Sequence, residues 1–185
     1  MRKLFEIDKK DYDPDGPVYR RPSARGIIIK GGKVAMVHSQ MFDYYKFPGG
    51  GIEGGESPEE AMAREVSEET GLTVIRSSIK EYGQVRRIQK GMEGNIFVQD
   101  NYYYFCEAEA GTKGQKLDDY EAEEGFSLEY ILPQLAIEKN RKSPVDEFSR
   151  EMLNRDARVL EMLVQEGYFA GENIKYEIRT KGERE

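Results

Sequence analysis

The chain of 185 residues is short of reactive side chains and of long apolar runs. Its one cysteine, Cys106, excludes an intramolecular disulfide, and its place in an aromatic run favours a buried thiol over a nucleophile. Because His38 is its one histidine, the chain has few residues from which a histidine-based catalytic mechanism could be built. No apolar run approaches the ~20 residues of a membrane span, and the N-terminus lacks a signal-peptide core. We therefore expect a cytoplasmic protein without a membrane partner.

Positive charge is also in short supply. The 28 lysine and arginine residues face 35 aspartate and glutamate residues, which gives a formal net charge of −7. A protein that coats nucleic acid needs a basic surface, so this balance argues against nucleic acid as a partner. It is compatible with an enzyme that recruits divalent cations and acts on a small molecule, either as a monomer or as a homodimer.

The length predicts one domain with one hydrophobic core. We expect an N-terminal arm at 1–22 with one short strand, the main domain at 23–170, and a C-terminal strand and tail at 171–185. At the start of the main domain, strand-like runs at 24–30 and 33–39 flank a Gly-Gly turn. Two such runs separated by two glycines predict a β-hairpin.

The second half of the chain predicts a mixture of strands and helices. The segment 72–89 reads as a strand, a turn and a second strand, and the aromatic run at 98–110 reads as a central strand. A short helix is expected to begin near Pro133. The clearest long helix is predicted over 143–166, with Ser143 as its N-cap.

The most informative stretch runs from Gly50 to Leu72 and reads GGIEGGESPEEAMAREVSEETGL. A glycine-rich turn opens it and a helix follows. Ser57 is a suitable N-cap, and Pro58 suits the first helical position, where its missing N–H costs nothing. Gly71 can end the helix in a left-handed conformation.

This helix has two distinct faces. Spacings of three and four residues bring Glu65, Glu68 and Glu69 to one side, while Met62 and Val66 form an adjacent stripe that can pack on a core. Glutamate-rich helix faces are usually just solvated. Converging carboxylates repel one another, however, and hard oxygen ligands are what Mg²⁺ and Mn²⁺ prefer. The pattern therefore also indicates a metal site.

The same stretch resembles the Nudix box, the signature of the Nudix hydrolases. Every specified position of that signature is filled: Gly50, Glu56, Arg64, Glu65, Val66, Glu68, Glu69, Gly71 and Leu72. The resemblance implies an α/β fold, the Nudix α/β/α sandwich with a mixed β-sheet. It also implies hydrolysis of a nucleoside diphosphate linked to some other moiety.

By the same resemblance, Glu65, Glu68 and Glu69 are expected to coordinate Mg²⁺ or Mn²⁺. The backbone carbonyl of Gly50 is a further candidate ligand. Glu56 is expected to support the loop and to contribute to a second ion. Metal ions suit this reaction because they neutralise phosphate oxygens and lower the pKa of bound water.

Two further roles follow from the resemblance. Arg64 is expected to orient the glutamates without being a ligand. The general base is a box glutamate, matched here by Glu65, or a glutamate from a later acidic loop, matched here by Glu121 with Glu124 as second choice. Glu121 and Glu124 could equally well be residues of a solvated acidic loop. We hypothesise Glu65 as the base.

Candidate substrate contacts precede the box. Arg25 is a candidate phosphate contact, because arginine binds phosphate bidentately, although ordinary surface charge explains it as well. The aromatic rings of Tyr44, Tyr45 and Phe47 could stack on a base, and core packing is the alternative, above all for Phe47.

The sequence does not identify the substrate. ADP-ribose pyrophosphatases often show a proline about fifteen residues after the box, where this chain has Arg87. A nucleoside triphosphate, including an oxidised one, is therefore slightly favoured over ADP-ribose or another nucleotide sugar. A non-catalytic nucleotide sensor of the same fold is the alternative from a different class, and an intact box argues against it.

Overall fold

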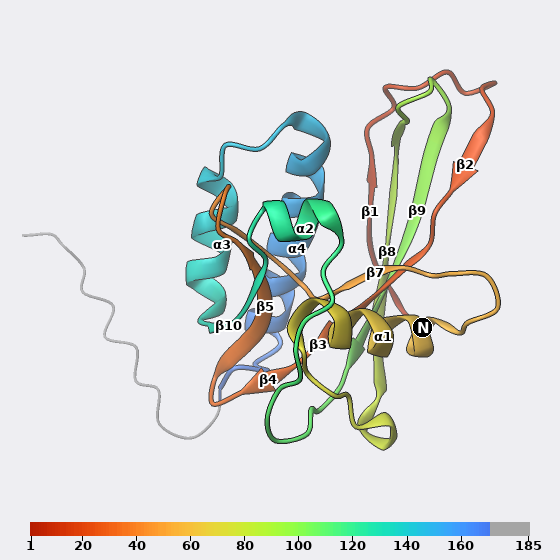
Figure 1. Ribbon diagram of the computed structural model, residues 1–185. Helices are drawn as coiled ribbons and strands as arrows, with labels where there is room; N and C mark the ends of the chain where they lie inside the picture. The colour runs from red at the N-terminus through yellow and green to blue at the C-terminus, as the bar shows by residue number, and fades with distance from the viewer. Residues whose placement is uncertain (171–185) are drawn as a thin grey trace, which may run out of the picture.

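Strands predominate in the first half of residues 1–170, the part of the chain that the computed structural model describes, and most of the helical residues follow in the second half (Figure 1). The strands are β1 Lys3–Asp8, β2 Val18–Arg20, β3 Ser23–Ile27, β4 Ile29–Lys30, β5 Lys33–Ser39, β6 Tyr44–Lys46, β7 Gly49–Gly51, β8 Lys80–Lys90, β9 Ile96–Phe105 and β10 Ser127–Ile131. The α-helices are α1 Pro58–Thr70, α2 Asp119–Glu123, α3 Pro133–Lys142 and α4 Glu147–Gln165, and a 3₁₀ helix spans Arg76–Ser78. None of these helices combines the length and the apolar character that a membrane span requires.

The strands form two sheets. The larger one has the order β1-β8-β9-β3-β7, with β2 also paired to β9. It is mixed, because β1 and β3 run parallel to β8 and β9 respectively, whereas β8 and β9 are antiparallel to each other. The smaller sheet is antiparallel, with the order β10-β5-β4 and β6 beside β5. The predicted α/β fold with a mixed sheet is confirmed.

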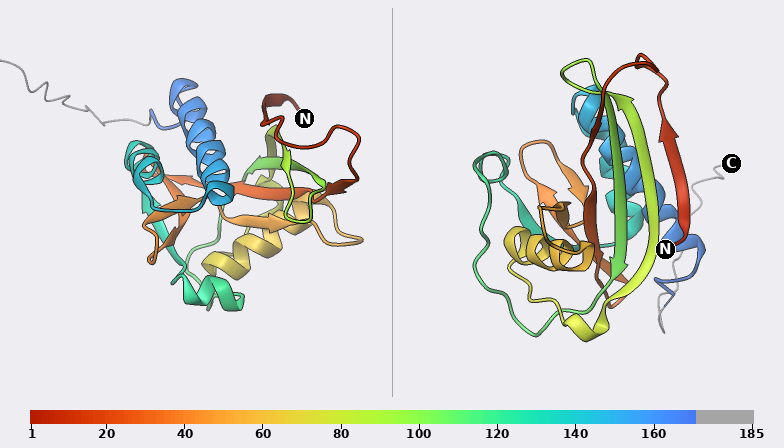
Figure 2. Two further views of the ribbon diagram at one scale, coloured as in Figure 1. Left: turned by 90° about the horizontal axis from the view of Figure 1, so that it is seen from above. Right: turned by 90° about the vertical axis from the view of Figure 1, so that its right-hand side faces the viewer.

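Apolar side chains cover both faces of the strands. On one face, Met62 and Val66 of α1 pack against Ala24, Tyr104 and Cys106. On the opposite face, α3 and α4 cover a second core built mainly on β3, β5, β8 and β9. Figure 2 shows these helices on the two sides of the strands, which is the α/β/α layering expected from the sequence.

Local signals place α1 where the sequence predicted it. Ser57 accepts a hydrogen bond from Glu60 N, and the Glu60 side chain accepts one from Ser57 N, which completes a capping box. Gly71 ends the helix with φ 73°, in the left-handed region that a residue without Cβ occupies at little cost. These caps satisfy backbone groups at both helix ends.

The N-terminal part of the chain differs from the expectation. Residues 1–22 contribute two strands, β1 and β2, where one short strand was predicted. The predicted strand at 24–30 is broken at Ile28, so that β3 belongs to the larger sheet and only β4 forms the hairpin with β5. Pairing partners far away in the sequence decide this break, and the local pattern does not contain them.

Two later predictions also change. Apart from an isolated bridge between Val74 and Ala108, the first strand expected in 72–89 is absent from the described structure. The long helix begins at Glu147 and its N-cap is Asp146, because Ser143 ends α3 and donates its hydroxyl to Phe42 O. The short helix α3 does begin at Pro133, as predicted. The strand and tail expected at 171–185 lie outside the described residues.

Candidate active site

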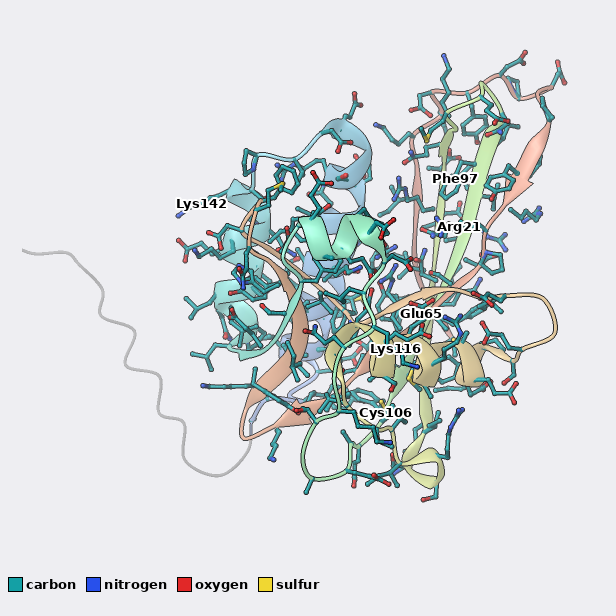
Figure 3. The ribbon with its side chains drawn as sticks, viewed as in Figure 1. Arg21, Glu65, Phe97, Cys106, Lys116 and Lys142 are labelled. Atoms are coloured by element: carbon teal, nitrogen blue, oxygen red, sulfur yellow. The ribbon has the colours of Figure 1, made fainter. Side chains whose placement is uncertain are left out.

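A cleft of about 810 Å³ lies beside α1 and the β7 turn. Its walls come from α1, from β3, β8 and β9, from the segment that leads into α2, and from α4. Figure 3 labels side chains on three of these walls: Arg21 and Phe97 beside the larger sheet, Glu65 on α1, and Lys116 before α2. The cleft therefore combines elements that are far apart in the sequence.

Arg64 organises the carboxylates at the α1 end of the cleft. Its guanidinium donates two hydrogen bonds to Glu56, at 2.7 and 3.2 Å, and its Nη1 donates to Glu65 at 2.9 Å and to Glu68 at 3.1 Å. Its Nη2 also donates to the carbonyl of Gly51. Only a planar guanidinium can serve this many acceptors in fixed directions. Arg64 thus links three carboxylates of the box through one side chain.

Gly50 and Glu65 are in unusually close contact. A Cβ atom placed on Gly50 would lie 2.4 Å from the carboxyl carbon of Glu65. A side chain on residue 50 would therefore displace the α1 carboxylate from its present position. Burial raises the pKa of Glu65, although hydrogen bonding to Arg64 opposes the effect. A raised pKa makes the carboxylate a stronger base.

Glu65, Glu68 and the Gly50 backbone offer hard oxygen donors of the kind that Mg²⁺ and Mn²⁺ prefer. Glu56 is linked to them through Arg64 and does not itself line the cleft. Across residues 1–170, no three carboxylate, histidine or cysteine side chains converge as they stand on one point that could hold a metal ion. Arg64 donates to one carboxylate oxygen of each of the two cleft residues, Oε1 of Glu65 and Oε2 of Glu68.

Glu69 lies in the cleft but in a different environment. It is 2% exposed, accepts a hydrogen bond from Lys46 Nζ at 2.7 Å, and accepts another from Gly49 N at 2.8 Å. Burial raises its pKa to about 7, against the opposing charge of Lys46. Both of its oxygens are occupied by donors from the protein, which sets it apart from Glu65 and Glu68.

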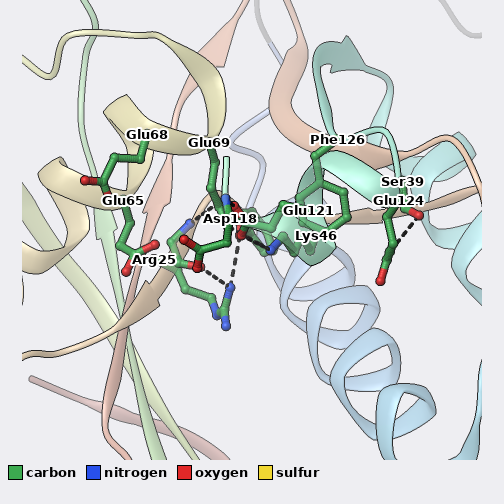
Figure 4. Close-up of polar contacts among 12 residues, drawn as sticks. Arg25, Ser39, Lys46, Glu65, Glu68, Glu69, Asp118, Glu121, Glu124 and Phe126 are labelled. Carbon is green, nitrogen blue, oxygen red and sulfur yellow. Dashed lines mark hydrogen bonds and ion pairs between the residues drawn. The ribbon is translucent and has the colours of Figure 1, made fainter. Parts of the chain in front are cut away.

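Glu121 reaches the cleft from α2, and the structure places it near the box (Figure 4). It accepts hydrogen bonds from Tyr120 OH and from Asp118 N, and its carboxylate lies 3.7 Å from Lys46 Nζ. Glu124, the second choice, instead accepts from Ser39 and Tyr44 and does not line the cleft.

The candidate substrate contacts divide into two groups. Arg25 lies in the cleft, buried, with its Nη1 donating to the carbonyls of Phe47 and Gly49. The three aromatic residues do not reach the cleft: Phe47 is fully buried in the core, Tyr44 packs on Phe126, and Tyr45 stacks on His38. Packing against these partners leaves no ring face for a nucleotide base.

Three cleft residues have no counterpart among the candidates that the sequence suggests. Lys46 of β6, Arg87 of β8 and Arg155 of α4 all line the cleft and are at most 6% exposed. The sequence drew attention to Arg87 only because ADP-ribose pyrophosphatases often have a proline at that position. Nothing local distinguishes these cations from surface residues. Their burial beside one cavity follows from the packing of three separate elements.

Buried positive charge is concentrated at the α4 side of the cleft. Burial lowers the pKa of Arg87 to about 10, and the neighbouring charge of Arg155 adds to the effect. Arg25 Nε and Arg155 Nη2 are buried without a hydrogen-bond partner among the described residues. Burying guanidinium donors without acceptors is costly, so an anion in this part of the cleft would lower the free energy of the folded state.

Comparisons with known proteins give a consistent result. The NUDIX domain family matches residues 20–150. A relative from Bacillus subtilis (strain 168), described as "Putative 8-oxo-dGTP diphosphatase YtkD", is 38% identical over 128 residues, which are 69% of this chain and 74% of that protein. An "ADP-ribose pyrophosphatase" of Methanocaldococcus jannaschii is 32% identical over 121 residues, 63% of this chain and 66% of that protein.

A solved structure agrees at the level of fold. The NUDIX hydrolase from Nitrosomonas europaea aligns with a TM-score of 0.54 over 76% of this chain and 90% of its own length. The two sequences are 17% identical, so this likeness concerns the fold alone.

Proposed function

The chain belongs to the NUDIX family and is a Nudix hydrolase, and from this premise we propose that it cleaves the pyrophosphate bond of a nucleoside triphosphate with the help of Mg²⁺ or Mn²⁺. The observation that carries the proposal is the composition of the cleft. Glu65 and Glu68, held by one arginine, share a single cavity with the buried arginines 25, 87 and 155. Such a cavity offers oxygen ligands for a cation and guanidinium donors for phosphate oxygens.

Each residue has a chemical task in this proposal. Glu65 accepts the proton of the water that attacks phosphorus, and the bridging P–O bond breaks as the pyrophosphate leaves. A bound divalent ion would neutralise phosphate oxygens and lower the pKa of that water. Arg64 holds Glu65 and Glu68 in position, and Arg25 offers positive charge to the phosphates.

The preference for a triphosphate rests on two supports. The Bacillus subtilis relative is named for a diphosphatase that acts on a nucleoside triphosphate. The buried residues Arg25, Arg87 and Arg155 also offer guanidinium donors to a chain of phosphates. An ADP-ribose pyrophosphatase is the second candidate, because the Methanocaldococcus jannaschii relative carries that name.

The test is a chromatographic assay of the nucleoside monophosphate product over nucleoside triphosphates, oxidised triphosphates and ADP-ribose, with and without Mg²⁺. We expect turnover that depends on metal and is fastest with a triphosphate. Glu65→Gln is expected to lower kcat by about 10²- to 10⁴-fold, because it removes the general base. Glu121→Gln is expected to cost far less.

Glu138→Gln serves as the matched control, since Glu138 is an exposed glutamate of α3 that pairs with Lys142 outside the cleft. Near-normal turnover of the Glu65→Gln variant would remove Glu65 as the base. Absence of turnover on the whole panel with metal present would refute the proposed substrate class.

A further inference from the structure

Lys46 brings a fixed positive charge to the place where the family resemblance expects a metal ligand. Its Nζ lies 2.7 Å from Oε1 of Glu69 and 3.7 Å from Oε1 of Glu121 (Figure 4). The three side chains are buried, with exposed fractions of 7%, 2% and 7% respectively. One ammonium group thus lies between two carboxylates in a site that is shielded from water.

The remaining carboxylate oxygens are also occupied. Glu69 Oε2 accepts from Gly49 N at 2.8 Å, and Glu121 Oε2 accepts from Asp118 N at 3.1 Å. Tyr120 OH donates to Glu121 Oε1 at 3.0 Å. A divalent ion could therefore bind Glu69 or Glu121 only by displacing donors that the protein itself supplies.

The position of Lys46 is well supported. Its ammonium lies 4.3 Å from the centre of the Phe126 ring, a favourable cation–π arrangement. Its strand, β6, is held by Asn140 of α3, which accepts from Tyr45 N and donates to Tyr45 O, both at 2.8 Å. The ammonium group is thus part of the folded structure and is not a surface charge that happens to lie nearby.

We propose that Lys46 takes the place of a divalent cation between Glu69 and Glu121, so that metal binding in this chain is confined to Glu65 and Glu68. The Glu69–Glu121 pair could then bind a divalent cation only if the Lys46 ammonium were removed. The inference rests on the proposed function only for the metal at Glu65 and Glu68. It departs from the resemblance, which assigns Glu69 to the metal.

Removal of the ammonium gives the inference its test. Lys46→Met keeps the length of the side chain and leaves two buried carboxylates without their cation. Since buried like charges need a counterion, Mn²⁺ or Mg²⁺ is expected to fill the site. Electron paramagnetic resonance with Mn²⁺ alone should count one more bound ion per chain in Lys46→Met than in the wild type.

Thermal unfolding provides a second readout that does not depend on turnover. A ligand that binds only the folded state raises Tm, so saturating Mg²⁺ should raise the Tm of Lys46→Met by ~5 °C more than that of the wild type. The double variant with Glu69→Gln should lose both the additional ion and the additional rise. Lys139→Met is the matched control, because Lys139 pairs with Asp43 on the surface.

If Lys46→Met fails to fold, the single variant Glu69→Gln tests whether Glu69 binds a metal ion. We expect this variant to keep the number of Mn²⁺ ions of the wild type, whereas Glu68→Gln should weaken Mn²⁺ binding at least tenfold. Loss of a bound ion on Glu69→Gln, or equal ion counts in the wild type and a folded Lys46→Met, would overturn the inference. Failure of the wild type to bind any Mn²⁺ would instead contradict the proposed function, and the Lys46→Met comparison would still decide the inference.

Discussion

At the scale of single residues, the buried pair Arg155 and Asp156 supports the floor of the cleft. Both side chains are fully buried. Asp156 accepts hydrogen bonds from Arg155 Nε at 2.9 Å, from Tyr103 OH at 2.9 Å and from Phe47 N at 3.1 Å. One carboxylate thus ties α4 to β9 and to the strand that leads into the box turn.

Removal of this carboxylate should be costly. Asp156→Asn leaves the guanidinium of Arg155 buried without its counterion, which typically costs about 3–5 kcal/mol in the free energy of unfolding. Urea unfolding at pH 7 measures the loss. Asp100→Asn is the control, because Asp100 pairs with the partly exposed Arg86 and such pairs contribute about 1 kcal/mol or less.

The same residue gives a pH dependence. Burial by itself would raise the pKa of Asp156, but the charges of Arg155 and Arg25 hold it below its usual range. A lowered pKa stabilises the folded state above the unfolded value of about 3.9, and this contribution is lost as the pH falls through the folded value. The wild type should therefore lose stability below about pH 4, and Asp156→Asn should lack that part of the loss. Equal acid sensitivity in both proteins would contradict this assignment.

At the scale of elements, the approach of β7 to α1 brings the box turn against the helix. β7 is three glycines long and pairs with β3, which also packs on α1. A Cβ on Gly50 would meet the Glu65 carboxylate of α1, whereas a Cβ on Gly49 or on Gly51 would meet residues outside α1. The glycines of the box therefore have a geometric function in addition to that of forming a turn.

Gly50→Ala should separate activity from stability. The added methyl group would displace the carboxylate of Glu65, and a misplaced reacting group can cost about 10²-fold in rate. Since the displaced group is the end of a flexible side chain, Tm should change by only a few degrees. Gly54→Ala is the matched control, because a Cβ there meets nothing within 4 Å. Activity of Gly50→Ala equal to that of the control would show that the close contact has no role.

At the scale of the whole molecule, the first strand belongs to the main core. β1 runs parallel to β8 at the edge of the larger sheet, and Phe5 packs in the core that α4 covers. Phe5 is 7% exposed, whereas Tyr19 of β2 is 51% exposed. The N-terminal segment thus contributes to the fold itself in this region.

Phe5→Ala should destabilise the whole protein by about 3–5 kcal/mol, the usual cost of truncating a buried phenylalanine. For a chain of this size the corresponding fall in Tm is about 10 °C, measured by calorimetry. Tyr19→Ala, at an exposed position of the same segment, should change stability by about 0.5 kcal/mol or less. Similar small effects of both changes would mean that residues 1–22 form a separate arm.

The sequence by itself determined α1, its caps and the acidic residues on its surface. Ser57 and Gly71 act through bonds to residues within one helical turn, and Pro58 acts through its fixed φ angle. The spacing of Glu65 and Glu68 places them on one side of any helix. Such local signals do not need the rest of the fold. The intact box, read from the order of its residues alone, likewise indicates the family.

Only the tertiary structure decided what surrounds those residues. Lys46 meets Glu69 across 23 positions of sequence, and Arg87 and Arg155 reach the cleft from different elements. The aromatic residues at 44, 45 and 47 turned inward because the cores on either side of β6 required their rings. The physical reason is that charge pairing and burial depend on which strands and helices become neighbours, and a linear pattern does not record that.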